Sequence, residues 1–171
     1  GLTVVSSSEG DRLLVACNLS DEVVIMDSSG NLLHRISLGN TPFVPSAYPY
    51  QVAANEKTAW VSLWNSSEVL QLDLEEGTIL RRIPLLSPDK PTAAGSHPGA
   101  MLLANHRLYV ALANADTIAV LQERTGKLLD LWSTRLPGQA LPGANPTALS
   151  ISEDGKTLFV ADSNANAIAV L

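Results

Sequence analysis

The stretch that decides the fold runs from Leu108 to Val120 and reads LYVALANADTIAV. It contains two short apolar segments that are separated by the polar turn sequence Asn114-Ala115-Asp116. A short run of Val, Ile, Leu or aromatic residues between turn residues is typical of a β-strand. The connection has the length of a hairpin, so we expect the two strands to pair antiparallel.

The first of these segments occurs four times along the chain. The copies are LLVA at 13–16, AWVS at 59–62, LYVA at 108–111 and LFVA at 158–161. Their valines, Val15, Val61, Val110 and Val160, lie 46, 49 and 50 residues apart, and a second apolar segment begins eight residues after each of them. A period between about 20 and 50 residues indicates a repeat architecture.

Two further apolar segments complete each repeat. One follows a turn glycine and spans 32–38, 79–85 or 128–132. The other begins at Pro49, Pro98 or Pro146, with Gly1 at the matching place. Four short strands in about 48 residues are the signature of a β-propeller blade. A four-stranded sheet has two apolar faces that it cannot bury alone, so neighbouring blades must cover them.

We therefore predict an all-β fold, an incomplete β-propeller domain that spans residues 1–171. It comprises about three and a half four-stranded antiparallel blades, at approximately 1–47, 48–97, 98–145 and 146–171, the last one truncated. Known propellers close with about 4 to 8 blades. Because the last strand stops abruptly at Leu171, we expect a larger parent ring of seven blades, whose remaining blades lie outside this sequence.

Composition argues against several classes of protein. The chain has 17 acidic against 11 basic side chains, so we expect no basic surface for nucleic acid or anionic lipid. No apolar run approaches the roughly 18 residues of a membrane-spanning helix. The single cysteine, Cys17, excludes an internal disulfide and a cysteine-based metal cage, and we expect it to be a small buried hydrophobe.

The repeat resembles the YVTN (YncE-like) β-propeller family over the whole chain. The resemblance is clearest where Pro98 is followed by LYVA at 108–111, by Asn114 and by TGK at 125–127. The last repeat shows it again as SEDGKTLFVAD at 152–162. Gln122 departs from the pattern, because it stands where this family has Asp.

A finer resemblance concerns the segments Tyr48-Pro49-Tyr50 and Ala94-Gly95-Ser96-His97-Pro98. They look like the propeller of bacterial proteins that join a YncE-like domain to an alkaline-phosphatase-like phosphoesterase. This resemblance implies an extracytoplasmic protein, periplasmic or secreted, in which the propeller precedes a C-terminal hydrolase domain. None of the phosphatase metal-site sequence occurs in these residues, so the resemblance assigns no metal ligand and no cofactor here.

Three long inserts are the candidates for a binding surface. They span Gly39 to Ala47, Leu86 to His97 and Ser133 to Asn145, and long loops on a rigid scaffold are where function tends to lie. Predicted binding residues at their inner ends, together with one unusual tryptophan in a turn, are Tyr48, Tyr50, His97, Asn145 and Trp64. The alternative is that Pro-led loops merely fix the angle at which each inner strand begins.

No catalytic constellation and no metal site is predicted. His97 is the only histidine on the expected binding face, and we expect a capping or solvated imidazole. Repeat positions explain the other polar candidates as turn residues: Asp27 and Asp73, and the asparagines Asn65, Asn114 and Asn164, which suit left-handed backbone. One register position holds Trp60, Tyr109 and Phe159, which predicts a packing layer between blades.

Three functions fit this pattern. The first is a noncatalytic scaffold and recognition module that binds an unknown ligand or protein partner through its long loops. The alternative is a lactonase-type hydrolase with its site at the mouth of the channel, where missing blades would add catalytic residues. A redox propeller that holds a quinone or metal is disfavoured by the scarcity of His and Cys.

Overall fold

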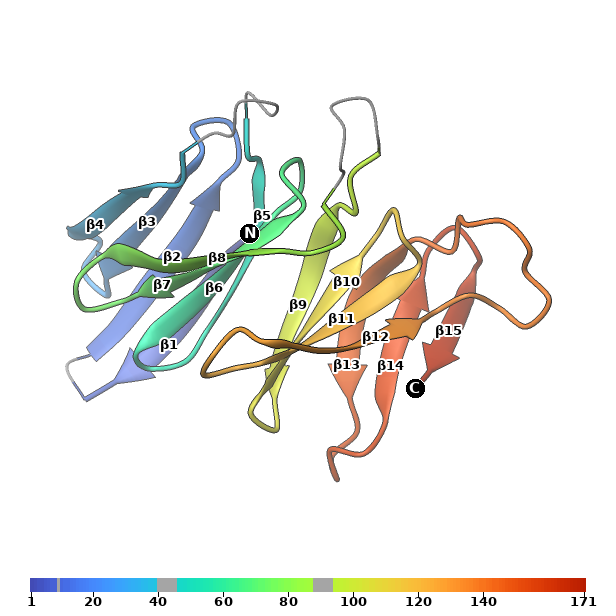
Figure 1. Cartoon of the computed structure of the whole chain (residues 1–171). Coiled ribbons are helices and arrows are strands. Elements are labelled where there is room, and N and C mark those ends of the chain that lie inside the picture. Colours follow the sequence, from blue (N-terminus) through green and yellow to red (C-terminus); the bar gives the residue numbers. More distant parts are fainter. Residues whose placement is uncertain (9, 40–45, 88–93) are drawn as a thin grey trace.

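The computed structural model describes residues 1–8, 10–39, 46–87 and 94–171, which form four antiparallel sheets (Figure 1). Blade 1 consists of β1 (Leu2–Ser7), β2 (Gly10–Cys17), β3 (Glu22–Asp27) and β4 (Leu32–Ser37). Blade 2 consists of β5 (Pro49–Ala54), β6 (Thr58–Leu63), β7 (Glu68–Asp73) and β8 (Thr78–Pro84). Blade 3 consists of β9 (Pro98–Ala104), β10 (Arg107–Leu112), β11 (Thr117–Gln122) and β12 (Leu128–Ser133). Blade 4 consists of β13 (Pro146–Ile151), β14 (Leu158–Asp162) and β15 (Ala167–Val170).

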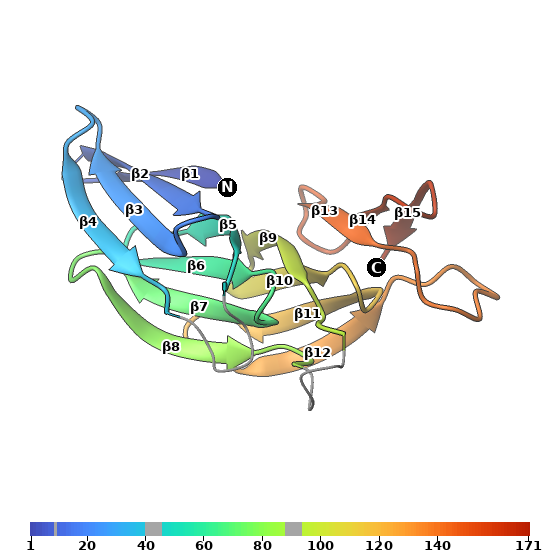
Figure 2. The same ribbon diagram turned by 90° about the horizontal axis from the view of Figure 1, so that it is seen from above.

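In every blade, consecutive strands lie side by side and pair antiparallel. Seen from above, the blades fan out so that β1, β5, β9 and β13 line the inner side and β4, β8 and β12 the outer side (Figure 2). The predicted all-β propeller with four-stranded antiparallel blades is therefore confirmed, and the fourth sheet has three strands.

The hydrophobic core is divided into three layers, one between each pair of neighbouring blades. In the second strand of a blade, successive side chains point alternately toward the preceding blade and toward the following blade. Trp60 packs in the layer between blades 2 and 3, whereas the adjacent Val61 packs between blades 1 and 2. Tyr109 and Val110 repeat this arrangement one blade further on. The predicted layer of large residues between blades is confirmed for Trp60 and Tyr109, whereas Phe159 on blade 4 is 40% exposed and packs in none of the three layers that the described residues form.

The innermost strands of blades 2, 3 and 4 all begin in the same way. Each starts at a proline, and the preceding residue has a positive φ: 53° at Tyr48, 52° at His97 and 58° at Asn145. The carbonyl oxygens of these residues accept hydrogen bonds from the backbone of the turn after the next strand. Because a left-handed residue reverses the chain locally, this geometry turns each connecting loop into its strand.

The register of blade 1 corrects one detail of the repeat. Val15 pairs with Leu2 and Val61 pairs with Val52, so Leu2 corresponds to Val52. Gly1 therefore lies two residues beyond the place of Pro49, and its expected match with the prolines is wrong.

The turns that follow the second strands hold the next blade. Residues with φ between 49° and 56° occur there at Asp21, Ser67, Asp116 and Asn166. In the first three blades, the side chain at this position accepts a hydrogen bond from a backbone N–H just before the next inner strand, at Tyr48, Ser96 and Asn145 respectively. One repeated side chain thus fixes the path of each loop into the following blade.

The predicted left-handed role of Asn65, Asn114 and Asn164 is wrong. The left-handed residue lies two positions later, at Ser67, Asp116 and Asn166. The asparagines instead donate their backbone N–H groups to the loop carbonyls of Ala47, Ser96 and Ala144. They still link loop and turn through the backbone, and Asn114 adds a side-chain hydrogen bond from its Nδ2 to the Gly95 carbonyl oxygen at 2.8 Å.

Asp27 and Asp73 are turn residues, as predicted. Asp27 Oδ1 accepts backbone hydrogen bonds from Ser29 and Asn31, both at 2.8 Å. Asp73 Oδ1 accepts two from the residues at 75 and 76, both at 2.9 Å. The hydrogen bonds from Asn31 lower the pKa of the Asp27 carboxyl, because they stabilise its ionised form.

Candidate functional site

The candidate site lies at the end of the blades where β5, β9 and β13 begin, which we call the loop face. It includes the segments that lead into these strands and the turns after β2, β6, β10 and β14. All three long inserts reach this end. Residues 40–45 and 88–93 of the first two inserts lie outside the described residues, whereas the third, from Ser133 to Asn145, is described throughout.

Three aromatic side chains stack across the boundary of blades 2 and 3. The ring centroids of Tyr50 and Trp64 lie 5.0 Å apart at 32°, and those of Trp64 and His97 lie 4.9 Å apart at 29°. We call this row the aromatic ladder. Gly99 lies directly against the ladder: a Cβ atom added there would lie 3.4 Å from the Trp64 ring and 3.8 Å from the Tyr50 ring. Aromatic pairs of this kind contribute about 0.5–1.5 kcal/mol each beyond their buried area.

Trp64 departs from the repeat. The equivalent positions, three residues after the valine, hold Asn18, Ala113 and Ser163. Tyr50 likewise corresponds to Gly99 in blade 3 and to Thr147 in blade 4. Because other blades place small or polar residues here, packing between blades does not require the ladder. It is an addition to this part of the loop face.

His97 is a neutral base at the end of the ladder. Burial lowers the pKa of its imidazole from the ordinary value of 6.5, since a charged ring would lose hydration there. The neutral ring offers one donor and one acceptor nitrogen. His97 therefore presents an uncharged polar edge to the adjacent cavity at neutral pH.

A cavity of about 250 Å³ lies beside the ladder. Its lining includes Trp64, His97, Asn114, Asn145 and Asn164. Three of the predicted binding residues, Trp64, His97 and Asn145, thus come together, and Tyr50 joins them through its ring contact with Trp64. Aromatic faces and carboxamides recognise uncharged groups by stacking and by paired hydrogen bonds.

Asp116 anchors the wall of this cavity. Its Oδ2 accepts a hydrogen bond from the Gly143 backbone at 2.7 Å and lies 3.5 Å from Arg135 Nε. Its Oδ1 accepts from the Asn145 backbone at 3.2 Å, and the Asn145 side chain donates to Ser163 Oγ at 2.9 Å. These contacts hold the last part of the third insert against the blade.

Sequence reasoning missed Asp116, Gly143 and Asn114 as parts of the site. Asp116 has a sequence signal, because Asp21 stands at the same repeat position in blade 1. The remaining predicted residue, Tyr48, is not in the cavity. Its backbone N–H donates to Asp21 Oδ1 at 2.8 Å, which places it at the boundary of blades 1 and 2.

Behind this site, the boundary of blades 3 and 4 contains an unusual polar pair. The other two boundaries bury Leu38 with Leu63 and Leu85 with Leu112 at the equivalent positions, and this boundary buries Thr134 with Asp162. Thr134 Oγ1 and both carboxylate oxygens of Asp162 are buried and find no hydrogen-bond partner among the described residues. Burial raises the pKa of Asp162, and the charge of Asp116 adds to this rise.

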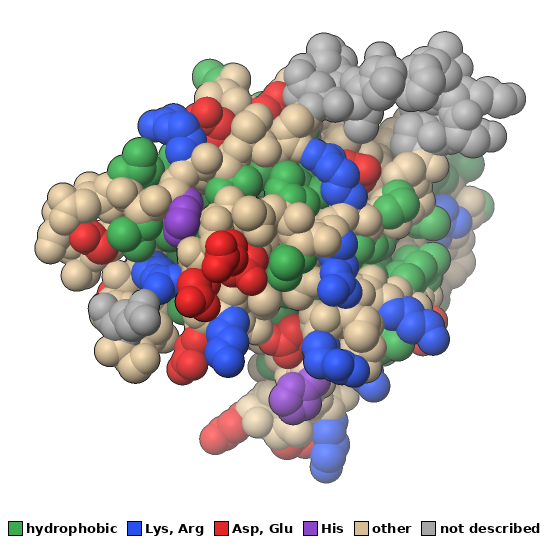
Figure 3. Space-filling model, turned by 60° about the vertical axis from the view of Figure 1, so that its left-hand side comes forward, with side chains coloured by type: hydrophobic (Ala, Val, Ile, Leu, Met, Phe, Trp, Pro, Cys, Tyr) green, Lys and Arg blue, Asp and Glu red, His purple; other side chains and the backbone are tan. Residues whose placement is uncertain are grey.

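Among the described residues, no group of three or more His, Cys, Asp or Glu side chains is placed to hold a metal ion. The described part of the chain contains no helix long and apolar enough to cross a membrane. On the surface shown in Figure 3, acidic and basic side chains are interspersed. The cavity at the loop face is lined by aromatic and carboxamide side chains together with the carboxylate of Asp116.

No protein-family model matches this chain, and no curated protein matches it. Among solved structures, it is similar to a streptogramin B lyase, with a TM-score of 0.74 and 17% identity, and to virginiamycin B lyase from Staphylococcus aureus, with 0.74 and 18%. It is also similar to the WD40 β-propeller domain of Doa1, with 0.69 and 13%.

These matches cover 98%, 98% and 96% of this chain but 49%, 50% and 48% of the matched chains. The chain thus spans about half the length of the propellers that it resembles. At this level of identity, the similarity shows the β-propeller fold alone.

Proposed function

We propose that this protein is a noncatalytic β-propeller recognition module that binds a ligand or partner at its loop face. The observation that carries the proposal is the aromatic ladder of Tyr50, Trp64 and His97 beside a cavity lined by asparagine side chains. The ladder is not needed for blade packing, because the positions equivalent to Tyr50 and Trp64 in other blades hold small or polar residues. Rigid aromatic rings beside amide groups are typical of recognition surfaces.

We further propose a wider setting for the module. The strand and turn motifs support membership of the YVTN (YncE-like) repeats, and the inserts support a parent that continues into an alkaline-phosphatase-like domain outside the cytoplasm. In a complete ring of seven blades, further blades would cover the exposed Leu2 and Val4 of blade 1 and Phe159 and Ile168 of blade 4. Asn166, at the repeat position of Asp21 and Asp116, would then hold the loop of a following blade.

A fragment screen by ligand-observed NMR tests the proposed binding surface. The library contains uncharged sugars, amides and small aromatic compounds, and the comparison is between the protein and its Trp64→Ala variant. Trp132→Ala is the matched control. Trp132 lies on the outer strand β12, where its ring contacts Tyr109 and is away from the ladder. We expect hits that Trp64→Ala loses and Trp132→Ala keeps. A screen whose hits are all indifferent to Trp64→Ala would rule out the ladder as a binding surface.

The second candidate function is a lactonase-type hydrolase at the same face. It is favoured by the neutral imidazole of His97, which lines the cavity and has the protonation state of a general base. One of the similar propellers is a lyase, so the β-propeller fold is compatible with an enzyme active site. Hydrolysis of γ-lactones by the propeller, abolished by His97→Ala, would replace the noncatalytic proposal. We expect no hydrolysis above the rate of the buffer.

A further inference from the structure

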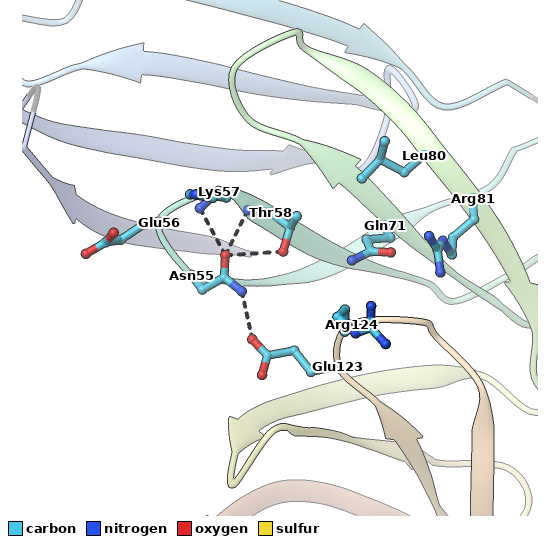
Figure 4. A pocket seen from close by; sticks show the side chains of 9 residues that line it. All are labelled: Asn55, Glu56, Lys57, Thr58, Gln71, Leu80, Arg81, Glu123 and Arg124. Carbon is cyan, nitrogen blue, oxygen red and sulfur yellow. Dashed lines mark hydrogen bonds between the residues drawn. The ribbon is translucent and has the colours of Figure 1, made fainter.

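A second cavity lies between blades 2 and 3, at the end opposite the loop face (Figure 4). We call it the inter-blade cleft. Its volume of about 540 Å³ is roughly twice that of the loop-face cavity and falls in the range of small-molecule sites, about 300–1,000 Å³. The turn between β5 and β6, the strands β7 and β8, and the turn between β11 and β12 surround it.

Contacts between the two blades frame the cleft on both sides. Asn55 Nδ2 donates a hydrogen bond to Glu123 Oε1 at 2.7 Å, and Asn55 Oδ1 accepts from the backbone of Lys57 and Thr58. Across the cleft, the guanidinium of Arg81 donates to the carbonyl oxygen of Thr125. Two links across the boundary keep the blades apart at a fixed distance, so the space is part of the fold.

The inner end of the cleft carries a polar side chain in an apolar position. Gln71 is 3% exposed, whereas the equivalent residues of the other blades are Ile25, Val120 and Val170. Its Oε1 has no partner among the described residues, and neither has the indole Nε1 of Trp60, its neighbour on β6. Buried polar groups are almost always hydrogen-bonded, so an amide in this place needs a partner.

The outer end of the cleft is positively charged in an acidic protein. Arg81 and Arg124 line it, and Figure 4 shows them with Gln71 around one space, whereas Lys57 lies on the other side of the cleft beside Asn55 and Glu56 points away. The other carboxylate of the lining, Glu123, is engaged by Asn55. Two guanidinium groups next to each other are suited to a carboxylate.

We propose that the inter-blade cleft binds a small organic acid. Its carboxylate lies between Arg81 and Arg124, and an uncharged hydroxyl at its inner end hydrogen-bonds with the amide of Gln71. Leu80, which is 45% exposed, covers its carbon chain. An uncharged donor is favoured over an ammonium group, because the three cations of the lining would repel a positive charge. A sugar acid has this combination of groups.

The proposal concerns a site at the other end of the blades, so it stands or falls independently of the loop face. Isothermal titration of the protein with D-gluconate tests it. Two matched compounds separate its parts: sorbitol has the hydroxyls without the carboxylate, and hexanoate has the carboxylate without the hydroxyls. We expect gluconate to bind at least about tenfold more tightly than either compound.

Variants then locate the site. Arg124→Gln and Gln71→Val are each expected to weaken gluconate binding by about tenfold or more, since the first removes one of the two guanidinium groups at the carboxylate and the second removes the amide at the hydroxyl. Valine fits at position 71, because Val120 and Val170 occupy that place in blades 3 and 4. Lys127→Gln is the control, as it removes a charge from the same turn but does not line the cleft.

Four outcomes would overturn the proposal. Three of them are an absence of gluconate binding at about 10 mM, equal affinities for gluconate and sorbitol, and equal effects of Arg124→Gln and Lys127→Gln. Retained affinity in Gln71→Val would also overturn it, because the ligand would then lie on the charged rim alone. Circular dichroism of each variant shows whether the blades remain folded.

Discussion

Replacing Thr134 and Asp162 by leucine should make the protein more stable. The double variant Thr134→Leu/Asp162→Leu gives the boundary of blades 3 and 4 the pair of leucines found at both other boundaries, where Leu38 and Leu63 are fully buried. In the present sequence, three oxygen atoms at this place are buried without a hydrogen-bond partner among the described residues. Each unsatisfied group costs about 1–3 kcal/mol, and more where it is charged.

The expected magnitude follows from two opposing contributions. Removing the two polar groups recovers about 2–6 kcal/mol. The larger leucine side chains have to fit a space shaped for Thr and Asp, which costs about 1–3 kcal/mol if the boundary does not widen. The net gain in the free energy of unfolding should be about 2 kcal/mol at neutral pH.

The gain should depend on pH. The pKa of Asp162 is raised above 3.8 in the folded state, so the unfolded chain ionises first as the pH rises. The folded wild-type protein therefore loses stability as the pH rises from 3.8 through the raised pKa. Below 3.8, Asp162 is protonated in both states and this penalty disappears. The advantage of the double variant is thus larger at neutral pH than in acid.

Urea denaturation at pH 7 and in acid measures both effects. The matched control is Leu85→Thr/Leu112→Asp, which puts the polar pair at the boundary of blades 2 and 3 and should lower stability at neutral pH. If Thr134→Leu/Asp162→Leu folded but were less stable than the wild type at pH 7, the two oxygens of Asp162 would have a stabilising partner and the reasoning would be wrong.

Three further predictions concern single residues. Asp116→Ala should speed amide hydrogen exchange at Gly143 and Asn145 and lower stability by about 2 kcal/mol, because both backbone groups lose their acceptor; unchanged exchange would contradict this. The pKa of His97, measured by NMR, should lie below 6.5. Because the unfolded chain then takes up the proton first, the stability of the protein should fall as the pH drops below 6.5. A measured pKa above 6.5 would refute the assigned burial of the imidazole. Leu112→Ala, at a fully buried position, should cost about 2–5 kcal/mol in urea denaturation, and a loss below about 1 kcal/mol would mean that this boundary is loosely packed.

The blades could be predicted from the sequence because the signal repeats. Val61 and Val110 mark the same strand in successive copies, and the turns on either side have hairpin length. Within a strand, the alternation of Trp60 and Val61 also follows from the pleat, which sends neighbouring side chains to opposite boundaries. Periodicity and pleat are local properties of the chain, so no knowledge of its tertiary structure was needed.

The backbone of the turns was harder to predict. Asparagine at position 65 or 114 has the residue type that suits left-handed backbone, yet the left-handed residue is Ser67 or Asp116. The stacking of one blade on the next selects which turn residue adopts this conformation, because that residue must offer its side chain to the following loop. Residue preference alone does not contain this requirement.

The candidate site could be predicted only in part. Trp64 was identified because it is unusual in its repeat, and His97 and Asn145 because they lie at the inner ends of long inserts; the structure brings all three to one cavity. The stacking of Trp64 on His97 depends on how blades 2 and 3 sit against each other, which no sequence pattern reports. The polar pair Thr134 and Asp162 did have a signal, since aligning the repeats sets both against leucines.

The indole N–H resonances of the three tryptophans provide the most direct test of the proposed role of the loop face. Trp64 belongs to the aromatic ladder, Trp60 is buried between blades 2 and 3, and Trp132 lies on an outer strand. In a two-dimensional NMR titration with the fragments that bind the protein, the Trp64 resonance should shift while that of Trp132 stays in place. A titration in which bound fragments leave the Trp64 resonance unmoved would contradict the proposal that the loop face is the recognition surface.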